Sequence, residues 1–162
     1  MRVVSHRGNT TGPGSLCERS FVERALADEY DVEVDVRCDG GMLTVGHDAS
    51  IYELPVLWTK EPTVSRLWYH AKDEAAMTRL ASINVRRFAH DAEASVLVYP
   101  ERYAWIHPKY NEILVPNGNS VILDIIGYPR VVKELLDELP FAVCTDWCGE
   151  WKEWLESEAP RV

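Results

Sequence analysis

The sequence predicts an α/β fold built on a parallel β-sheet, and two observations carry this prediction. Short apolar runs typical of strands alternate along the chain with segments of helical periodicity. Ionisable residues also recur where the apolar runs stop, and parallel α/β folds bind their ligands at the carboxyl ends of strands. We therefore expect a functional site at this edge of the sheet, although polar residues at strand ends can also mark simple turns. The residues concerned are His6, Asp35, Lys72, His90, His107, Asp124 and Asp146.

Strands and helices alternate from the first residues onward. The runs typical of strands are Val3–Ser5, Asp31–Arg37, Met42–Val45, Leu67–Lys72 and Arg87–His90. Apolar residues at helical spacing predict one helix around residues 21–26. A second helix is expected to begin after Asp73, a residue type that often caps helix N-termini, and to continue through Leu80.

The second half of the chain continues the alternation. Strands are predicted at 104–107, 121–125 and 141–145, with a helix at 131–139 between the last two. Trp147, Trp151 and Trp154 are spaced by four and three residues, which places them on one face of a C-terminal helix. We expect this helix to pack on the sheet, the alternative being a surface for a partner. Since no repeat or linker interrupts the series, residues 1–162 are expected to form a single domain.

The composition is that of a globular protein with a net negative charge. Hydrophobic residues make up 46% of the chain, and the formal net charge is −9. Binding to long nucleic acid needs a basic surface, so we do not expect it. No apolar run approaches the length that spans a membrane, and no signal peptide is visible. We expect a cytoplasmic protein whose cysteines are reduced thiols without a zinc site. They are Cys17, Cys38, Cys144 and Cys148.

The segment 31–36 alternates acidic residues with valines. Side chains of a strand point to opposite faces in turn, so the valines share one face and the acids share the other. In a barrel strand the valines would pack under the outer helices, and Glu33 and Asp35 would project inward. Two neighbouring carboxylates repel each other unless protons or a cation compensate, and a hard divalent cation is the simplest compensation. A solvated acidic face on a half-exposed strand is the alternative.

Two histidines stand in short polar motifs before and after this segment. The motif HRG at residues 6–8 ends the first predicted strand, and GHD at 46–48 ends the strand that follows the acidic one. Histidine exchanges a proton near neutral pH, so His6 and His47 are candidates for a general acid and base pair. Arg7 is a candidate for clamping a phosphate with two parallel hydrogen bonds.

A third polar cluster is His70-Ala71-Lys72. Residues 70 and 72 share a strand face with Trp68. If Lys72 points towards the acidic residues, it is a candidate for neutralising a phosphate oxygen. An ion pair with Glu33 or Asp35 is the alternative for this lysine, and it is compatible with the same function.

Taken in order, these motifs resemble the glycerophosphodiester phosphodiesterases. The family typically carries HRG, a downstream EN, ExD, DG and HD. This chain has HRG at residues 6–8, then Glu18, then Glu33 and Asp35 separated by one residue, then DG at 39–40 and HD at 47–48. The likeness covers the first fifty residues and extends more faintly to residues 70–72 and 143–146.

The resemblance implies a small, trimmed (β/α)8 TIM-type barrel related to the phosphatidylinositol-specific phospholipase C superfamily. It implies that Glu33 and Asp35 hold one divalent metal ion, and that the catalytic acid and base are the histidines of the HRG and HD motifs. The expected substrate is a small phosphodiester such as a glycerophosphodiester, bound with the help of Arg7 and Lys72. The metal and Arg7 would stabilise the charge that grows on the phosphoryl oxygens.

The chain departs from the family pattern at three places. The asparagine of the EN motif is absent after Glu18, and His70 stands where the family usually has a glutamate. His70 is therefore a candidate third metal ligand, and its imidazole shifts the expected ion from calcium and magnesium towards manganese or zinc. Asp91 or Asp124 is an alternative source of an oxygen ligand. A length of 162 residues is short for a barrel of about 250, so helices must be trimmed or absent.

Two further functions fit the same sequence. One is a catalytically silent barrel used as a binding protein, which the short length and His70 favour and the otherwise intact motif residues oppose. The other is hydrolysis of a phospholipid or a nucleotide phosphodiester on the same scaffold. Trp58, Trp68 and Trp105 are expected to pack in the core or at its rim rather than to stack a base. The sequence sets no oligomeric state.

Overall fold

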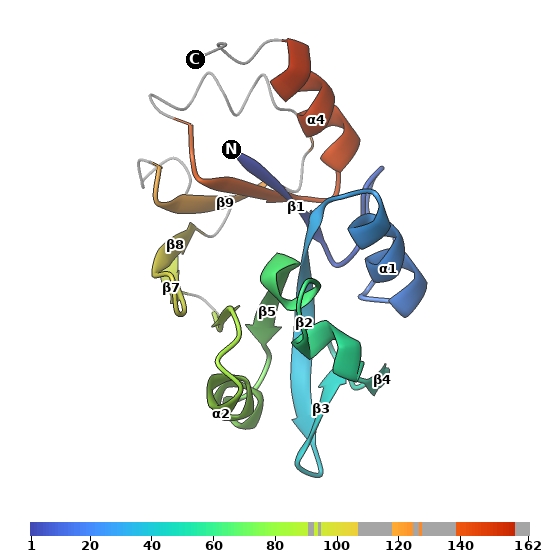
Figure 1. The fold of residues 1–162 in the computed structure, drawn as a ribbon, viewed down its shortest axis with the longest axis vertical. Coiled ribbons are helices and arrows are strands. Elements are labelled where there is room, and N and C mark those ends of the chain that lie inside the picture. The colour runs from blue at the N-terminus through green and yellow to red at the C-terminus, as the bar shows by residue number, and fades with distance from the viewer. Residues whose placement is uncertain (91–92, 94, 107–117, 125–126, 128–138, 158–162) are drawn as a thin grey trace.

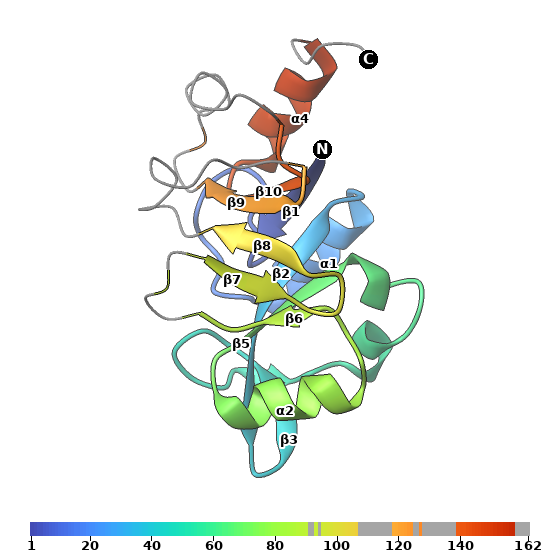
Figure 2. The same cartoon turned by 90° about the vertical axis from the view of Figure 1, so that its left-hand side faces the viewer.

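The computed structural model describes residues 1–90, 93, 95–106, 118–124, 127 and 139–157, and these residues form a mixed α/β structure (Figures 1 and 2). The α/β class predicted from the sequence is confirmed. The helices are α1 (Arg19–Ala27), η1 (Val56–Thr59), η2 (Val64–Arg66), α2 (Glu74–Ser82) and α4 (Cys148–Ser157). The strands are β1 (Arg2–His6), β2 (Asp31–Asp39), β3 (Met42–Val45), β4 (Tyr52–Glu53), β5 (Leu67–Ala71), β6 (Arg87–Phe88), β7 (Ser95–Val98), β8 (Tyr103–Ile106), β9 (Ser120–Asp124) and β10 (Ala142–Thr145).

The strands form one sheet with the order expected of a trimmed α/β barrel. From β1, parallel pairing runs through β10 and β9 to β8 on one side, and through β2 and β5 to β6 on the other. The β3–β4 hairpin extends β2 in antiparallel pairing, and β7 pairs antiparallel with β8. An isolated antiparallel bridge between Arg87 and Tyr99 links the first residue of β6 to the chain that follows β7. Figure 2 shows β9, β8, β7 and β6 one below the other.

The valines of β2 face the helices, as their alternation with acids predicts. Val32, Val34 and Val36 are fully buried in one apolar cluster. The cluster also includes Val22 and Ala25 of α1, Ala76 and Leu80 of α2, and Trp58 of η1. Because alternate side chains of a strand point to opposite faces, the acids of β2 must lie on the inner face of the sheet.

The inner face of the sheet is filled by large aromatic side chains. Trp68 of β5, Phe88 of β6 and Trp105 of β8 are buried there together with Val4 and Cys144. The rings of Phe88 and Trp105 stack with their centroids 4.2 Å apart. The expectation that Trp58, Trp68 and Trp105 pack in the core is therefore confirmed.

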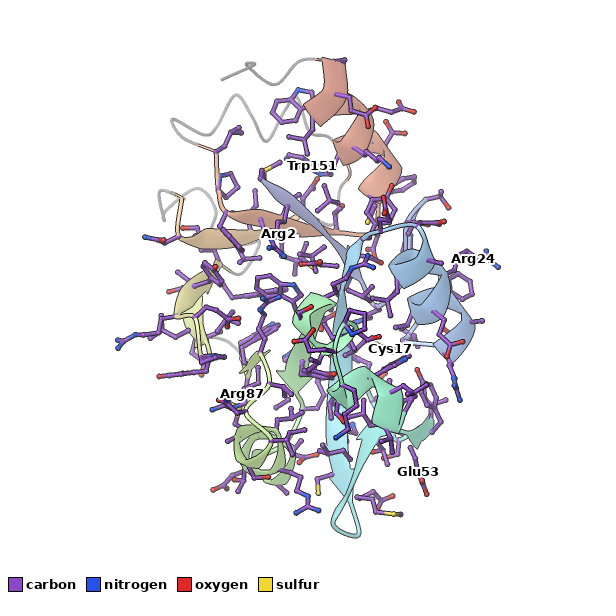
Figure 3. All side chains as sticks on the ribbon, viewed as in Figure 1. Arg2, Cys17, Arg24, Glu53, Arg87 and Trp151 are labelled. Carbon is purple, nitrogen blue, oxygen red and sulfur yellow. The ribbon has the colours of Figure 1, made fainter. Side chains whose placement is uncertain are left out.

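Helix α4 covers the outer face of the strands near the chain termini. Its Trp151 and Trp154 are buried against Ile106, Ile122 and Val143 of β8, β9 and β10. Figure 3 shows Trp151 between α4 and the sheet. The prediction that a C-terminal helix packs on the sheet is confirmed for Trp151 and Trp154, whereas Trp147 precedes α4 and lies beside Gly12 and Gly127.

Helix α2 begins where its sequence predicts. The Asp73 carboxylate accepts a hydrogen bond from the backbone N–H of Ala76 at 2.7 Å, which satisfies one of the free N–H groups of the first turn. The other carboxylate oxygen of Asp73 accepts a hydrogen bond from the backbone N–H of Cys38 at 3.1 Å. The cap therefore also fixes α2 against the end of β2.

The sequence predicted most strands within two residues and missed two. β2 runs on to Asp39 because its last residues pair with β3, with Asp39 opposite Met42. The strands not predicted are β4, which has only two residues, and β7, although β7 contains the apolar run Val96-Leu97-Val98. The strand predicted at 87–90 is confined to Arg87–Phe88. The predicted helix at 131–139, together with Asp91 and His107, falls almost entirely outside the described residues.

None of the helices in the described part of the chain is long and apolar enough to cross a membrane. All four cysteines are free thiols, and three of them are buried.

Gly8, the last residue of the HRG motif, allows the chain after β1 to pass directly against α1. It has a φ of +85°, and a Cβ there would lie 2.7 Å from the backbone nitrogen of Val22 and 2.8 Å from the backbone carbon of Phe21. We expect Gly8→Ala to lower the free energy of unfolding by about 2 kcal/mol or more, because both strain and a backbone clash result. Gly14→Ala is the control, since a Cβ at Gly14 meets nothing within 4 Å. Urea denaturation of both variants measures the difference, and equal stabilities would contradict the prediction.

Candidate metal and acid–base site

Strand register brings most of the predicted site residues together on the inner face of the sheet. His6 of β1 lies opposite Glu33 of β2, and Asp35 of β2 lies opposite His70 of β5. Side chains of directly paired residues point to the same side of a sheet. The two pairs are therefore neighbouring rows of one site, with Asp146 following β10 on the other side of β1.

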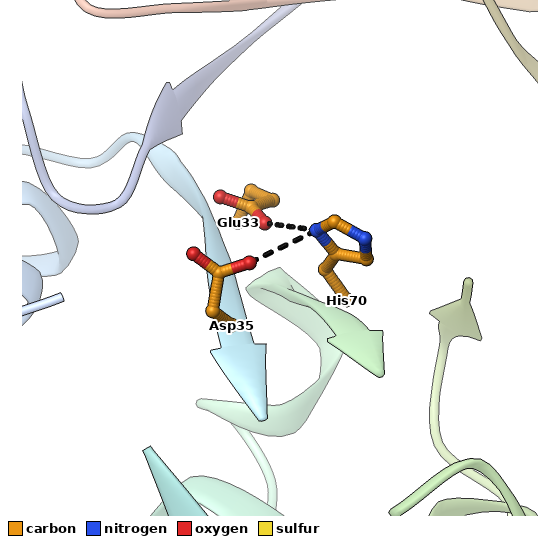
Figure 4. A group of neighbouring side chains, drawn as sticks. All are labelled: Glu33, Asp35 and His70. Carbon is orange, nitrogen blue, oxygen red and sulfur yellow. Dashed lines mark ion pairs between the residues drawn. The ribbon is translucent and has the colours of Figure 1, made fainter. Parts of the chain in front are cut away.

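Glu33, Asp35 and His70 form a compact group that fits a metal ion. Each offers a ligand atom, and these atoms lie within 4.8 Å of one another. The His70 Nδ1 atom lies 2.9 Å from Asp35 Oδ1 and 3.4 Å from Glu33 Oε1 (Figure 4). The exposed fractions are 1% for Glu33, 0% for Asp35 and 5% for His70, so the group is shielded from bulk water. The alternative of a solvated acidic face is wrong.

One carboxylate oxygen of the group has neither a hydrogen bond nor an ion pair among the described residues. Glu33 Oε2 is buried and accepts no hydrogen bond from the described residues. A buried acceptor without a partner is costly, and for a charged group the cost is larger still. A divalent cation held by two carboxylates and an imidazole would satisfy this oxygen, so the donor set fits a metal ion.

Asp35 is surrounded by cationic groups. Arg7 Nε lies 2.9 Å from Asp35 Oδ2, and Lys72 Nζ lies 3.6 Å from Asp35 Oδ1. Burial alone would raise the pKa of Asp35, but His70, Arg7 and Lys72 outweigh it and hold that pKa well below its usual value. Burial alone would lower the pKa of His70, and the carboxylates of Asp35 and Glu33 reverse this and raise it. For Lys72, the structure shows the ion pair that the sequence offered as the alternative.

Arg7 adopts an unusual backbone conformation. Its φ is +57°, in the left-handed region that few residues other than glycine populate. The Arg7 backbone N–H donates to the carbonyl of Glu33 at 3.1 Å, which ties the turn after β1 to β2. Such conformations persist where the surrounding structure holds them and are frequent at functional sites. Here the turn directs the guanidinium group onto Asp35.

His6 is held by a carboxylate that the sequence did not assign to it. Its Nδ1 lies 3.0 Å from Asp146 Oδ1, and the same oxygen accepts a hydrogen bond from Asn9 Nδ2 at 2.7 Å. Burial alone would raise the pKa of Asp146, but the hydrogen bonds from His6 and Asn9 outweigh it and lower that pKa. Because Nδ1 is engaged with Asp146, Nε2 is the nitrogen of His6 that is left for proton transfer.

His47 stands apart from this group. Its ring Nδ1 lies 2.6 Å from Asp48 Oδ1, and its side chain is 29% exposed. Its backbone carbonyl accepts hydrogen bonds from Arg37 Nη2 at 2.7 Å and Nε at 3.1 Å. Among the described residues, no hydrogen bond or ion pair joins the His47 ring to the acids of β2. The turn itself is close to them, since the Gly46 N–H donates to the Asp35 carbonyl at 3.0 Å.

Aromatic rings fix the plane of His70. The ring of Phe88 stacks on it with a centroid distance of 4.9 Å and an interplanar angle of 6°. The ring of His90 also stacks on it, at 4.5 Å and 13°. Sequence analysis did not find this stack, because it depends on the pairing of His70 with Phe88 across β5 and β6.

Of the two alternative oxygen ligands, Asp124 does not join the site. Asp124 Oδ2 accepts a hydrogen bond from Trp151 Nε1 at 2.7 Å, so this carboxylate faces α4 on the outer side of the sheet. Asp91 lies outside the described residues.

The lowered pKa of Asp146 predicts how the stability of the protein depends on pH in acid. A carboxyl group whose pKa is lower in the folded protein than in the unfolded chain stabilises the fold. This contribution is complete above the pKa in the unfolded chain, about 3.9, and is lost as the pH falls through the lower pKa of the folded state. We expect Asp146→Asn to be less stable than the wild type at pH 7, with the difference shrinking below about pH 4. Thermal unfolding from pH 7 to pH 3 measures it. A difference that stays constant with pH would contradict the prediction.

One solved structure shares this fold. It is that of a candidate glycerophosphodiester phosphodiesterase from Galdieria sulphuraria, with a TM-score of 0.51 and 12% sequence identity. The match covers 96% of this chain and 98% of the other. The likeness shows the fold. No protein-family model matches the sequence, and no curated protein matches it.

Proposed function

We propose that this protein is a metal-dependent phosphodiester hydrolase that acts on a small phosphodiester such as a glycerophosphodiester. The observation that carries the proposal is the buried group of Glu33, Asp35 and His70 beside a histidine held by Asp146. A metal site next to an oriented histidine suits phosphoryl chemistry better than simple binding, because binding alone needs no proton-transfer group. The fold likeness to a candidate glycerophosphodiester phosphodiesterase supports the same reading.

Glu33, Asp35 and His70 would hold one divalent ion, which when bound polarises a phosphoryl oxygen and offsets its growing charge. Arg7 Nε lies 2.9 Å and Lys72 Nζ 3.6 Å from the Asp35 carboxylate, beside the proposed metal position. In this position the two cations balance the carboxylates before substrate binds. They then attract the phosphoryl oxygens electrostatically.

His6 and His47 would exchange the protons. One histidine accepts the proton of a water molecule or a substrate hydroxyl as that oxygen attacks phosphorus. The bond between phosphorus and the alcohol oxygen breaks, and the other histidine donates a proton to the departing alcohol. The contact with Asp146 keeps the His6 proton on Nδ1, so that Nε2 serves in this transfer.

We also infer that the chain is a short, divergent member of the glycerophosphodiester phosphodiesterase family and forms a single domain. The Arg87–Tyr99 bridge carries two backbone hydrogen bonds, at 2.7 Å and 2.8 Å, and supports closure of the strands into a barrel. A cytoplasmic location fits the free cysteines.

Hydrolysis of bis(p-nitrophenyl) phosphate and glycerophosphocholine by EDTA-treated protein tests the proposal. Calcium, magnesium, manganese or zinc is then restored separately. We expect activity to be absent after EDTA and to return with at least one metal. Folded protein that binds metal but hydrolyses neither these substrates nor a phospholipid or nucleotide phosphodiester would overturn the proposal in favour of a binding barrel.

A further inference from the structure

We propose that the metal site selects a late transition-metal ion of the zinc and iron class over calcium and magnesium, with His70 as the selecting ligand. This inference rests on the metal site of the proposed function and adds the class of ion. Imidazole is a good ligand for zinc and iron, whereas calcium prefers six to eight oxygens and magnesium an octahedron of them. The described residues of the site offer two carboxylates and one imidazole nitrogen.

The spacing of the donor atoms is compatible with zinc, and the imidazole donor, not the spacing, separates zinc from magnesium. In a tetrahedral zinc site with bonds of about 2.0–2.1 Å, neighbouring ligand atoms lie about 3.3 Å apart. His70 Nδ1 lies 2.9 Å from Asp35 Oδ1 and 3.4 Å from Glu33 Oε1. Three protein ligands with one open position is also the pattern of catalytic zinc sites.

The charges around the group disfavour an ion bound by charge alone. Arg7 and Lys72 both lie on Asp35, so two cations already offset the two carboxylates. A hard cation such as calcium or magnesium is held mainly by carboxylate charge, so its affinity for a site with little net charge is low. An ion that also bonds to the His70 nitrogen loses less affinity, because that bond does not depend on the charge of the carboxylates.

The rings around His70 hold its nitrogen in place. Phe88 and His90 stack on the imidazole at 4.9 Å and 4.5 Å, and both rings are nearly parallel to it. Ring orientation fixed by neighbouring groups raises the affinity of a metal ligand because less freedom is lost on binding. Phe88 is therefore a positioning residue for His70.

The test measures metal binding on the full chain after EDTA treatment. Calorimetry gives the affinities for zinc, calcium and magnesium in the wild type and in His70→Glu, which restores an all-carboxylate set. We expect the ratio of zinc affinity to calcium affinity to fall at least tenfold in His70→Glu. Cobalt serves as a spectroscopic probe, and its visible absorption should change in His70→Glu but not in His47→Gln, which removes a more exposed histidine.

Equal affinity ratios in the wild type and His70→Glu, or a cobalt spectrum unaffected by the substitution, would overturn the inference. If His70→Glu does not fold, His70→Gln replaces it. We expect His70→Gln to lose the cobalt spectrum, and an unchanged spectrum would contradict the inference. Hydrolysis measured on the same samples separates the two proposals. Hydrolysis that occurs with calcium alone would contradict the proposed metal selectivity and support the proposed hydrolase. Zinc binding through His70 without hydrolysis of any phosphodiester would support the metal selectivity and contradict the hydrolase.

Discussion

Replacing Glu33 by glutamine is expected to abolish metal-dependent hydrolysis, with a loss in kcat/KM of about 10³-fold or more. The substitution keeps the shape of the side chain but removes the charge of a buried ligand whose Oε2 has no hydrogen-bond partner among the described residues. Metal stabilisation of a phosphoryl transition state is worth several kcal/mol, and each 1.4 kcal/mol corresponds to a tenfold change in rate. Initial rates at saturating metal, together with calorimetric metal affinity, measure the effect.

Glu53→Gln is the matched control, since Glu53 lies exposed on β4 (Figure 3). It removes the same charge from the protein and should leave the rate within twofold of the wild type. Circular dichroism establishes that Glu33→Gln is folded, which we expect because the loss of one charge from a buried pair of carboxylates also relieves their repulsion. Full activity of folded Glu33→Gln would show that Glu33 is not a metal ligand.

The alternation in β2 could be read from the sequence because it depends on one strand alone. Side-chain direction has a fixed period of two, so the valines and the acids were predicted to lie on opposite faces. The strand alone left a solvated acidic face open, and the neighbouring motifs of His6 and His47 favoured an interior one. The structure confirms this division, with the valines under α1 and α2 and the acids buried opposite them. Local periodicity therefore predicted the most important pair of the candidate site.

Contacts between distant strands could not be read in this way. His6 and Asp146 are separated by 140 positions, and only the parallel pairing of β1 with β10 brings them together. Strand order and register are set by the packing of the whole sheet, so the sequence around His6 does not identify Asp146 as its partner, nor the reverse. The stacking of Phe88 on His70 has the same origin.

Periodicity used more fully would have separated two of the strand-end acids. In β9, Ile122 packs outward with α4, so Asp124 two positions later must point outward as well. In β10, Cys144 lies in the inner cluster, and Asp146 follows it at the same spacing towards His6. A polar residue at the end of a strand belongs to the site only when it is an even number of positions from a residue whose side chain faces the inside of the sheet.

His6→Gln is expected to lower kcat about 10²- to 10⁴-fold, the usual contribution of a general acid or base, with little change in metal affinity. Asp146→Asn is expected to lower kcat about tenfold or more, because the amide no longer holds the His6 proton on Nδ1. The control is Asp28→Asn at an exposed position beyond the end of α1, which should have no effect.

The double variant separates a shared role from two independent ones. If Asp146 acts only through His6, the loss in the double variant equals that of His6→Gln alone, since residues that act as a unit are not additive. Additive losses would mean that Asp146 contributes by another route, such as fixing the loop through Asn9, whose side chain donates to it at 2.7 Å. A merely structural Asp146 would lower metal affinity together with kcat. A positioning role predicts that kcat falls while metal affinity is retained.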